Sequence, residues 1–265
     1  MIDRGASRVL RINRPLALNA ISSQVGQALS DAFAAADHDP TVRAIVVTGT
    51  GTRAFSAGAD LKEMAAGGQV AEQSAQIVSD MLRHRPNLPV IAAVNGLAYG
   101  GGFELVLACD LAVCSTHAEF ALPEVSRGIV AGGGGLVRLP HLVGPRRAMS
   151  LALTGEPIDA DQALQWGVVN EVVPPAQVLD AALRLAATVA QHPRATTEAS
   201  KLAIRDAARA TPPFPADSTM TTTKECSDDR GKAEQTAGEG ADPRGPTRDL
   251  SVTGNVRSSG RQRPG

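Results

Sequence analysis

Short runs of β-branched residues alternate with helical patterns along the first 210 residues of this chain, and the alternation restricts the fold more than any other feature. Two of the runs, "RAIVVTG" (43–49) and "LPVIAAVNG" (88–96), are apolar at consecutive positions, which is typical of strands buried on both faces of a sheet. The helical pattern "AEQSAQIVSDMLRH" (71–84) lies between them and ends before Pro86. Strands and helices that alternate in this way predict a layered α/β fold.

The other elements that we expect continue the alternation. Strands are expected at "SRVLRI" (7–12), "DLAVCS" (110–115) and "EFAL" (119–122), and helices at 23–37, 144–153, 160–166, 176–191 and 195–210. The first of these helices carries Val25, Leu29 and Phe33 on one side, as an amphipathic helix requires.

The composition changes at Thr211. From there to the end, the chain has four residues of the types Leu, Ile, Val and Phe, against seven Gly, six Pro and thirteen Ser or Thr. Such a segment cannot bury enough apolar surface to offset about 1–2 kcal/mol of backbone entropy per ordered residue. We therefore predict that residues 211–265 form a disordered tail.

Charge and hydropathy exclude several classes of function. The formal net charge is −1, so no overall positive field draws the chain to nucleic acid or to a membrane surface. The apolar stretch 88–113 is interrupted by Asn95, Glu104 and Asp110, and the opening "MIDRGASRVL" has no apolar segment of the kind that a signal peptide needs. We expect no nucleic-acid partner, no membrane span and no secretion.

Cysteine and histidine usage predicts a cytoplasmic protein without a metal site. The three cysteines are odd in number and have no CxxC spacing, which is typical of thiols in a reducing compartment. The five histidines include no HxxxH pair, so we do not expect a bound metal.

The stretch "NGLAYGGGFELVLACD" (95–110) places three glycines directly before a helical pattern, with Glu104 among apolar residues. A carboxylate in a first helical turn gains from the helix dipole, which is a purely structural interpretation of Glu104. Three glycines in that turn cost about 0.5–1 kcal/mol each relative to alanine. Their presence indicates that the backbone binds a ligand, because unblocked N–H groups at a helix N-terminus form an oxyanion site.

A second segment, "RAFSAGADLKEM" (53–64), allows both interpretations. Asp60 fits the N-cap of a helix, whereas Gly58 and Ala59 would let a ligand approach free N–H groups. The preceding "VVTGTGTRA" (46–54) fits a dinucleotide fingerprint only loosely, because its glycines do not open a helix. We do not expect a nicotinamide cofactor.

A third segment, "ALPEVSRGIVAGGGG" (121–135), also fits an ordinary helix start at Pro123 and Glu124. The set of segments changes this interpretation. The blocks "INRPLALNA", "AFSAGADLKEM", "NGLAYGGGFELVLACD", "FALPEVSRGIV", "GGLVRLPHLVG" and "LTGEPIDADQALQWGVVNEVVP" have the order and spacing of the enoyl-CoA hydratase/isomerase (crotonase) superfamily. The chain resembles this superfamily over roughly residues 5–210.

The resemblance implies an architecture. It predicts a crotonase-like α/β spiral of repeated ββα units over residues 1–195, a C-terminal helix at 196–210, and a homotrimer or dimer of trimers. Members of the superfamily continue with helices that close the acyl site, so the tail 211–265 departs from their pattern.

The resemblance also implies roles for single residues. Ala59 and Gly101 match the two backbone N–H donors that hold the thioester oxygen, and Glu104 and Glu124 match the two catalytic glutamates. The residues carried over as substrate-binding are Ala57, Ala59, Asp60, Leu61, Lys62 and Gly101. Coenzyme A would lie along residues 59–62 as part of the substrate, so no separate cofactor is expected.

These residues imply an enoyl-CoA hydratase of fatty acid metabolism, which adds water across the 2,3 double bond of a 2-enoyl-CoA thioester. Superfamily members that only shift a double bond generally lack the first glutamate, whereas both are present here. The alternatives are an isomerase, a specialised hydroxyacyl-CoA dehydratase and a catalytically weakened relic. An RNA-associated role is disfavoured, because no basic stripe with interleaved aromatic residues is present.

Overall fold

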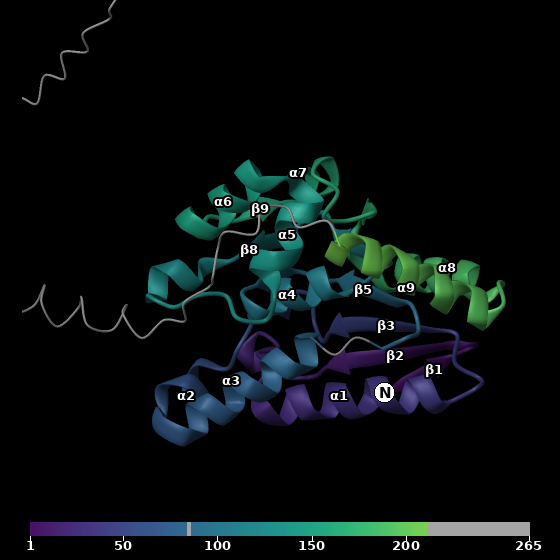
Figure 1. Cartoon of the computed structure of the whole chain (residues 1–265), viewed down its shortest axis with the longest axis horizontal. Helices are drawn as coiled ribbons and strands as arrows, with labels where there is room; N and C mark the ends of the chain where they lie inside the picture. Colours follow the sequence, from purple (N-terminus) through teal and green to yellow (C-terminus); the bar gives the residue numbers. More distant parts are fainter. Residues whose placement is uncertain (84–85, 211–265) are drawn as a thin grey trace, which may run out of the picture. The chain divides into compact units, whose positions relative to one another are not determined.

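The structure is a computed structural model that describes residues 1–83 and 86–210 (Figure 1). Six strands form the main sheet, in the order β1-β2-β3-β5-β7-β10. Their bounds are β1 Ile2–Arg4, β2 Ser7–Ile12, β3 Ala44–Gly49, β5 Val90–Val94, β7 Leu111–Ser115 and β10 Glu171–Val173. Strand β1 is antiparallel to β2, and all the other neighbours are parallel.

Strands β3 and β5 are buried along their whole length, as their unbroken apolar runs predict. Both faces of the sheet are covered, so successive side chains enter different parts of the interior. Ile45 and Val47 belong to the larger core cluster, whereas Val46 and Ile91 belong to a second cluster with helix α8 (Val178–Ala190).

A second sheet has the order β4-β6-β8-β9, with β4 Ala54–Ser56, β6 Leu97–Tyr99, β8 Glu119–Ala121 and β9 Ile158–Asp159. Its first three strands each follow a strand of the main sheet: β3 leads to β4, β5 to β6 and β7 to β8. A helical segment follows each pair. This order confirms the expected α/β spiral of ββα units.

Most of the remaining helices occupy the predicted segments, with small shifts at their ends. The remaining helices are α1 Ser23–His38, α2 Leu61–Ala65, α3 Gly68–Arg83, α4 Gly101–Ala108, α5 Gly135–Val143, α6 Pro145–Thr154, α7 Ala160–Gln165 and α9 Arg194–Ala210, with the 3-10 helices η1 Pro15–Ala17, η2 Pro123–Arg127 and η3 Pro175–Gln177. Helix α5 was not expected, because a run of glycines leads into it and Pro140 lies within it. Strands β4 and β6 were not predicted either. They have three residues each, which is too short for an alternation of apolar and polar residues to be recognised in the sequence.

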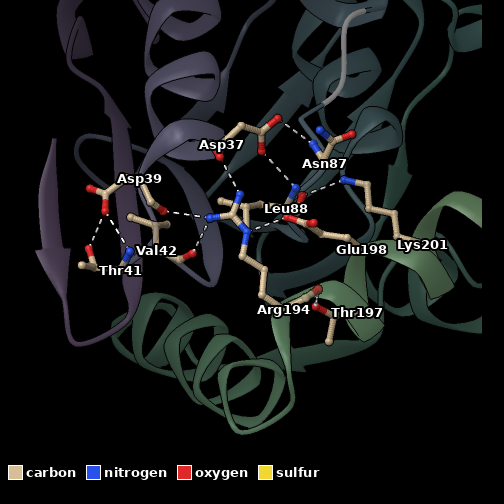
Figure 2. Close-up of polar contacts among 10 residues, drawn as sticks. All are labelled: Asp37, Asp39, Thr41, Val42, Asn87, Leu88, Arg194, Thr197, Glu198 and Lys201. Carbon is tan, nitrogen blue, oxygen red and sulfur yellow. Dashed lines mark hydrogen bonds and ion pairs between the residues drawn. The ribbon is translucent and has the colours of Figure 1, made fainter.

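Helix α9 is fastened to earlier parts of the chain by polar contacts (Figure 2). The Arg194 guanidinium donates to the backbone carbonyls of Asp37 at 2.6 Å and Asp39 at 2.8 Å, at the end of α1. Carbonyls at a helix C-terminus have no intrahelical partners, so the arginine satisfies acceptors that α1 leaves over. About two helical turns after Arg194, Lys201 donates a hydrogen bond to the backbone carbonyl of Leu88 at 2.8 Å.

The predicted disordered tail, 211–265, lies outside the described residues, so that prediction and the domain boundary at 211 stay untested. Among the helices that the structure describes, none combines the length and hydrophobicity needed to cross a bilayer.

Candidate active site

Glu104 is buried on α4, a helix with apolar residues on every side. The residue is 3% exposed. Its Oε1 accepts a hydrogen bond from the backbone N–H of Gly135 at 2.8 Å. Because Gly135 is the first residue of α5, the carboxylate satisfies one of the N–H groups that a helix start leaves over and gains from the helix dipole.

Glu124 is the second residue of η2, a 3-10 helix that begins two residues after the end of strand β8. Its Oε2 is buried and has no hydrogen-bond partner among the described residues. Its Oε1 lies beside the start of α4, since a Cβ built on Gly100 would be 3.0 Å away from it. Buried polar atoms are almost always paired in native structures, so the unpaired oxygen indicates a place for a ligand or a water molecule.

Burial raises the pKa of both carboxyl groups. For Glu104, the N–H groups of Gly135 and Gly133 oppose the rise in pKa without cancelling it. For Glu124, burial raises the pKa to about 7, and the charge of Glu104 adds to the rise. Two carboxyl groups that repel each other in this way do not ionise independently, so the pair retains a proton at pH values where an exposed glutamate would be ionised.

Both glutamates line a cavity of about 190 Å³. The segment after β4 contributes Ala57, Ala59 and Leu61, and the start of α4 contributes Gly101. Most of the remaining side chains are apolar and come from α2, α3 and the segment after η2: Met64, Ala75, Val78, Leu82, Ile129 and Val130. Both predicted catalytic glutamates and both predicted backbone donors therefore meet at one site.

A larger hollow of about 470 Å³ lies between the β1–β2 turn and α8. Its lining has no carboxylate, histidine or cysteine and consists of Arg4, Gly5, Ala6, Ser7, Leu183, Ala187, Ala190 and Gln191. The groups capable of acid–base chemistry are in the smaller cavity.

The backbone of Ala59 is fixed by a parallel bridge to Ile21. The Ile21 N–H donates to the Gly58 carbonyl at 2.7 Å, and the Asp60 N–H donates to the Ile21 carbonyl at 3.1 Å. Successive N–H groups of an extended strand point to opposite sides, so the Ala59 N–H faces away from Ile21. Gly101, whose N–H has no acceptor within its helix, lies close to Ala59: a Cβ built on it would be 3.5 Å from Ala59 N.

Two of the three consecutive glycines are required by the fold, which corrects the interpretation that ligand binding explains the whole run. Gly100 has φ +53°, a conformation that is strained for other residues. A Cβ on Gly102 would lie 2.2 Å from the carbonyl oxygen of Ser56. On Gly101, a Cβ would meet only ordinary contacts of 3.5 Å or more. The fold therefore leaves unexplained only the glycine at the predicted donor position.

Asp60 and Lys62 do not line the cavity among the residues described. Asp60 is the N-cap of α2, as its structural interpretation predicts, because it accepts from the Lys62 N–H at 3.0 Å. It also pairs with the Arg14 guanidinium at 2.7 Å. The Lys62 side chain is exposed. A direct contact of either side chain with substrate stays a prediction.

Glu63 supports the site and was missed by sequence reasoning. Its carboxylate accepts from the Ser23 N–H at 2.8 Å and from the hydroxyls of Ser23 and Ser74 at 3.2 Å and 2.5 Å. Ser74 lines the cavity. Glu63 thus ties α2 to the start of α1 and to α3. A charged residue within a short helix gives no sign in the sequence that it is bonded in this way.

The loose dinucleotide segment connects two strands, β3 and β4, and opens no helix. A Cβ on Gly49 would lie 2.5 Å from the carbonyl oxygen of Ala54, so that glycine serves packing. Within residues 1–83 and 86–210, no three His, Cys, Asp or Glu side chains are grouped to hold a metal ion.

Comparison with known proteins agrees with this geometry. The family model for enoyl-CoA hydratase/isomerase matches residues 5–234, past residue 210 where the motif resemblance ends. The chain is 43% identical over 189 residues to a carnitinyl-CoA dehydratase of Salmonella arizonae, covering 69% of this chain and 70% of the relative. It is 38% identical over 203 residues to a short-chain-enoyl-CoA hydratase of Clostridium acetobutylicum, covering 76% and 78%.

Solved structures extend the likeness to the fold. A crystal structure of an enoyl-CoA hydratase from Bacillus anthracis superposes with a TM-score of 0.76 at 28% identity, covering 89% of this chain and 88% of that one. The family match covers well over half of the chain, and the order of ββα units is the one that the resemblance predicts. The chain belongs to the enoyl-CoA hydratase/isomerase family.

Proposed function

We propose that this protein is an enoyl-CoA hydratase, which adds water reversibly across the 2,3 double bond of a 2-enoyl-CoA thioester. The observation that carries the proposal is the meeting of two carboxyl groups, the buried Glu104 and the half-buried Glu124, in one cavity with the backbone of Ala59 and Gly101. Relatives named as hydratases, at 37–38% identity over about three quarters of the chain, support it.

The two backbone N–H donors would stabilise the negative charge that develops on the substrate. Attack of water at the β carbon moves electrons toward the thioester carbonyl, whose oxygen becomes enolate-like. The N–H groups of Ala59 and Gly101 would donate to that oxygen. Each donor of this kind typically contributes about 10²–10³ in rate, and Gly101 stands at the N-terminus of α4, where the helix dipole favours negative charge.

The two carboxyl groups differ in a way that divides their roles. Glu104 accepts the Gly135 N–H, which favours its carboxylate form, and it would act as the base that takes a proton from water. Glu124 has an unpaired oxygen and a pKa raised to about 7 by burial, so it is partly protonated near neutral pH. It would act as the acid that delivers a proton to the α carbon.

Crotonyl-CoA tests the proposal directly. Hydration removes the conjugated double bond, so the absorbance of the conjugated thioester should fall after the purified protein is added. Heat-inactivated protein is the control. No loss of absorbance at substrate concentrations well above the usual range of KM, up to about 1 mM, would refute a hydratase of short acyl chains.

A second candidate is the dehydration of a specialised hydroxyacyl-CoA. The likeness to carnitinyl-CoA dehydratases, at 42–43% identity, favours it. Dehydration is the reverse of hydration and uses the same two carboxyl groups, so the acyl chain that the cavity accepts decides between the two.

We also propose the setting in which the enzyme works. Apolar side chains exposed on α5 to α7, namely Val137, Leu142, Met149, Leu153 and Leu164, support a homotrimer or dimer of trimers. The buried thiol of Cys114 supports a cytoplasmic location. The chemistry needs no metal and no redox cofactor, because carboxyl groups supply the acid and the base and coenzyme A belongs to the substrate.

A further inference from the structure

Arg127 is a cation at the cavity that the catalytic proposal does not use. It lies on η2, three residues after Glu124, and it lines the same cavity. It has no ion pair and no hydrogen bond with any residue that the structure describes, and its side chain is exposed. Its charge nonetheless acts on Glu124, whose pKa it lowers against the larger effect of burial. The guanidinium field therefore reaches the reacting carboxyl group.

The surroundings of the cavity are positive as well. Charges of Arg138 and Arg83 act on Glu104, and Arg138 is held in place by donating to the carbonyls of Gly133 at 2.8 Å and Leu82 at 2.6 Å. Three guanidinium groups thus act on two carboxyl groups whose pKa values are raised by burial.

Among the residues that the structure describes, the lining has no aromatic ring that could hold a quaternary ammonium group. Proteins recognise such groups with the faces of aromatic rings. The two carboxyl groups of the cavity would face the reacting carbons in the proposed mechanism, and most of the other side chains that line the cavity are apolar.

We propose that Arg127 selects the substrate by charge: the enzyme takes acyl-CoA thioesters with an uncharged acyl chain and rejects those with a cationic chain. The proposal rests on the hydratase function above and identifies its substrate class. Arg127 lines the same cavity as Glu124, so the cationic end group of an acyl chain held in this cavity would meet a like charge at short range. Like charges at such distances in a partly screened site change affinity by about tenfold or more.

The test uses two substrates of the same shape that differ in charge. Carnitinyl-CoA carries a trimethylammonium group, and its neutral isostere, 3-hydroxy-5,5-dimethylhexanoyl-CoA, carries a tert-butyl group at the same position. Dehydration of each is followed by the absorbance of the conjugated product, with wild type, Arg127→Gln, and Arg146→Gln as the control at an exposed arginine on α6 that does not line the cavity. Isothermal calorimetry measures the binding of both compounds.

Wild type and Arg146→Gln should prefer the neutral isostere in kcat/KM by about tenfold or more, and Arg127→Gln should reduce this preference by about fivefold or more. Equal kcat/KM values for the two substrates in wild type, or an unchanged ratio of kcat/KM in Arg127→Gln, would overturn the proposal. If Arg127 instead binds a phosphate of coenzyme A, the Arg127→Gln substitution would raise KM for both compounds equally and leave that ratio unchanged. If 3-hydroxybutyryl-CoA is not turned over either, the hydratase function fails, and the ratio of binding affinities from calorimetry still decides the charge selection.

Discussion

Replacing Glu124 by Gln should lower turnover and raise stability, and the gain in stability should depend on pH. The carboxyl group has a pKa of about 7 in the folded chain against 4.5 for an ordinary glutamate. A carboxyl group whose pKa is higher in the folded state destabilises the folded chain progressively as the pH rises from the unfolded to the folded value. Glutamine carries no charge at any pH, so the substitution removes this cost.

The size of the effect follows from the two pKa values. Linkage gives a cost of about 1 kcal/mol at about pH 5.5 and about 3 kcal/mol at about pH 8.5, as an upper bound, because one pKa unit corresponds to about 1.4 kcal/mol. The stability of Glu124→Gln relative to wild type should therefore improve by about 2 kcal/mol between these pH values. Urea unfolding at both pH values measures it, with the exposed Glu156→Gln as the control.

Activity is measured on the same samples. Loss of a positioned acid typically costs about 10²–10⁴ in turnover, so crotonyl-CoA hydration should fall by that much while the fold is retained. A stability difference that does not change with pH would show that the carboxyl group is not strained by burial. Turnover within about tenfold of wild type would show that Glu124 is not the acid.

Three further predictions address the backbone and its support. Gly101→Pro should lower turnover by about 10² or more, because proline has no N–H to donate. Its circular dichroism spectrum should be unchanged, because proline suits the first helical position. Gly101→Ala keeps the N–H, so its turnover should stay within about tenfold of wild type, and equal losses in both variants would refute the donor role. Gly102→Ala should lower the melting temperature by several degrees, since its Cβ would lie 2.2 Å from the Ser56 carbonyl; an unchanged melting curve would contradict the packing described. Glu63→Ala should raise KM and lower kcat for crotonyl-CoA, because it frees α2 from Ser23 and Ser74. Glu63→Gln keeps one acceptor oxygen and should bring KM and kcat part of the way back to the wild-type values. Wild-type kinetics in Glu63→Ala would show that α2 does not need this support.

The sequence predicts the long elements of this fold because their patterns are strong. Strand β5 is apolar at every position and β3 at every position except Thr48, and both strands are buried along their whole length. Helix α5 was not predicted, because it begins at a run of glycines and contains Pro140, and both residue types are unfavourable in helices. Its formation depends on tertiary contacts, among them the hydrogen bond from Gly135 to Glu104, which no local pattern can reveal.

The glycines show where motif reasoning and structure diverge. The cost of three consecutive glycines is visible in the sequence, but its causes are not. Gly100 is required because its φ is positive, and Gly102 is required because the carbonyl of Ser56 in strand β4 lies too close for a Cβ. Both causes depend on the three-dimensional arrangement. Glu63 and Arg127 gave no signal either, because an exposed charge and a charge at a cavity are indistinguishable in a sequence.

Glu104 and Glu124 are proposed to add water to a 2-enoyl-CoA. This addition can be followed by mass spectrometry of crotonyl-CoA that has been incubated with the protein in D2O. We predict a product that has gained one D2O. Its hydroxyl deuterium exchanges in H2O, whereas the deuterium on the α carbon is retained through chromatography and washing. Neither Glu104→Gln nor Glu124→Gln should give this product over the same time. Recovery of unchanged crotonyl-CoA, or of an isomer without added water, would contradict this proposal.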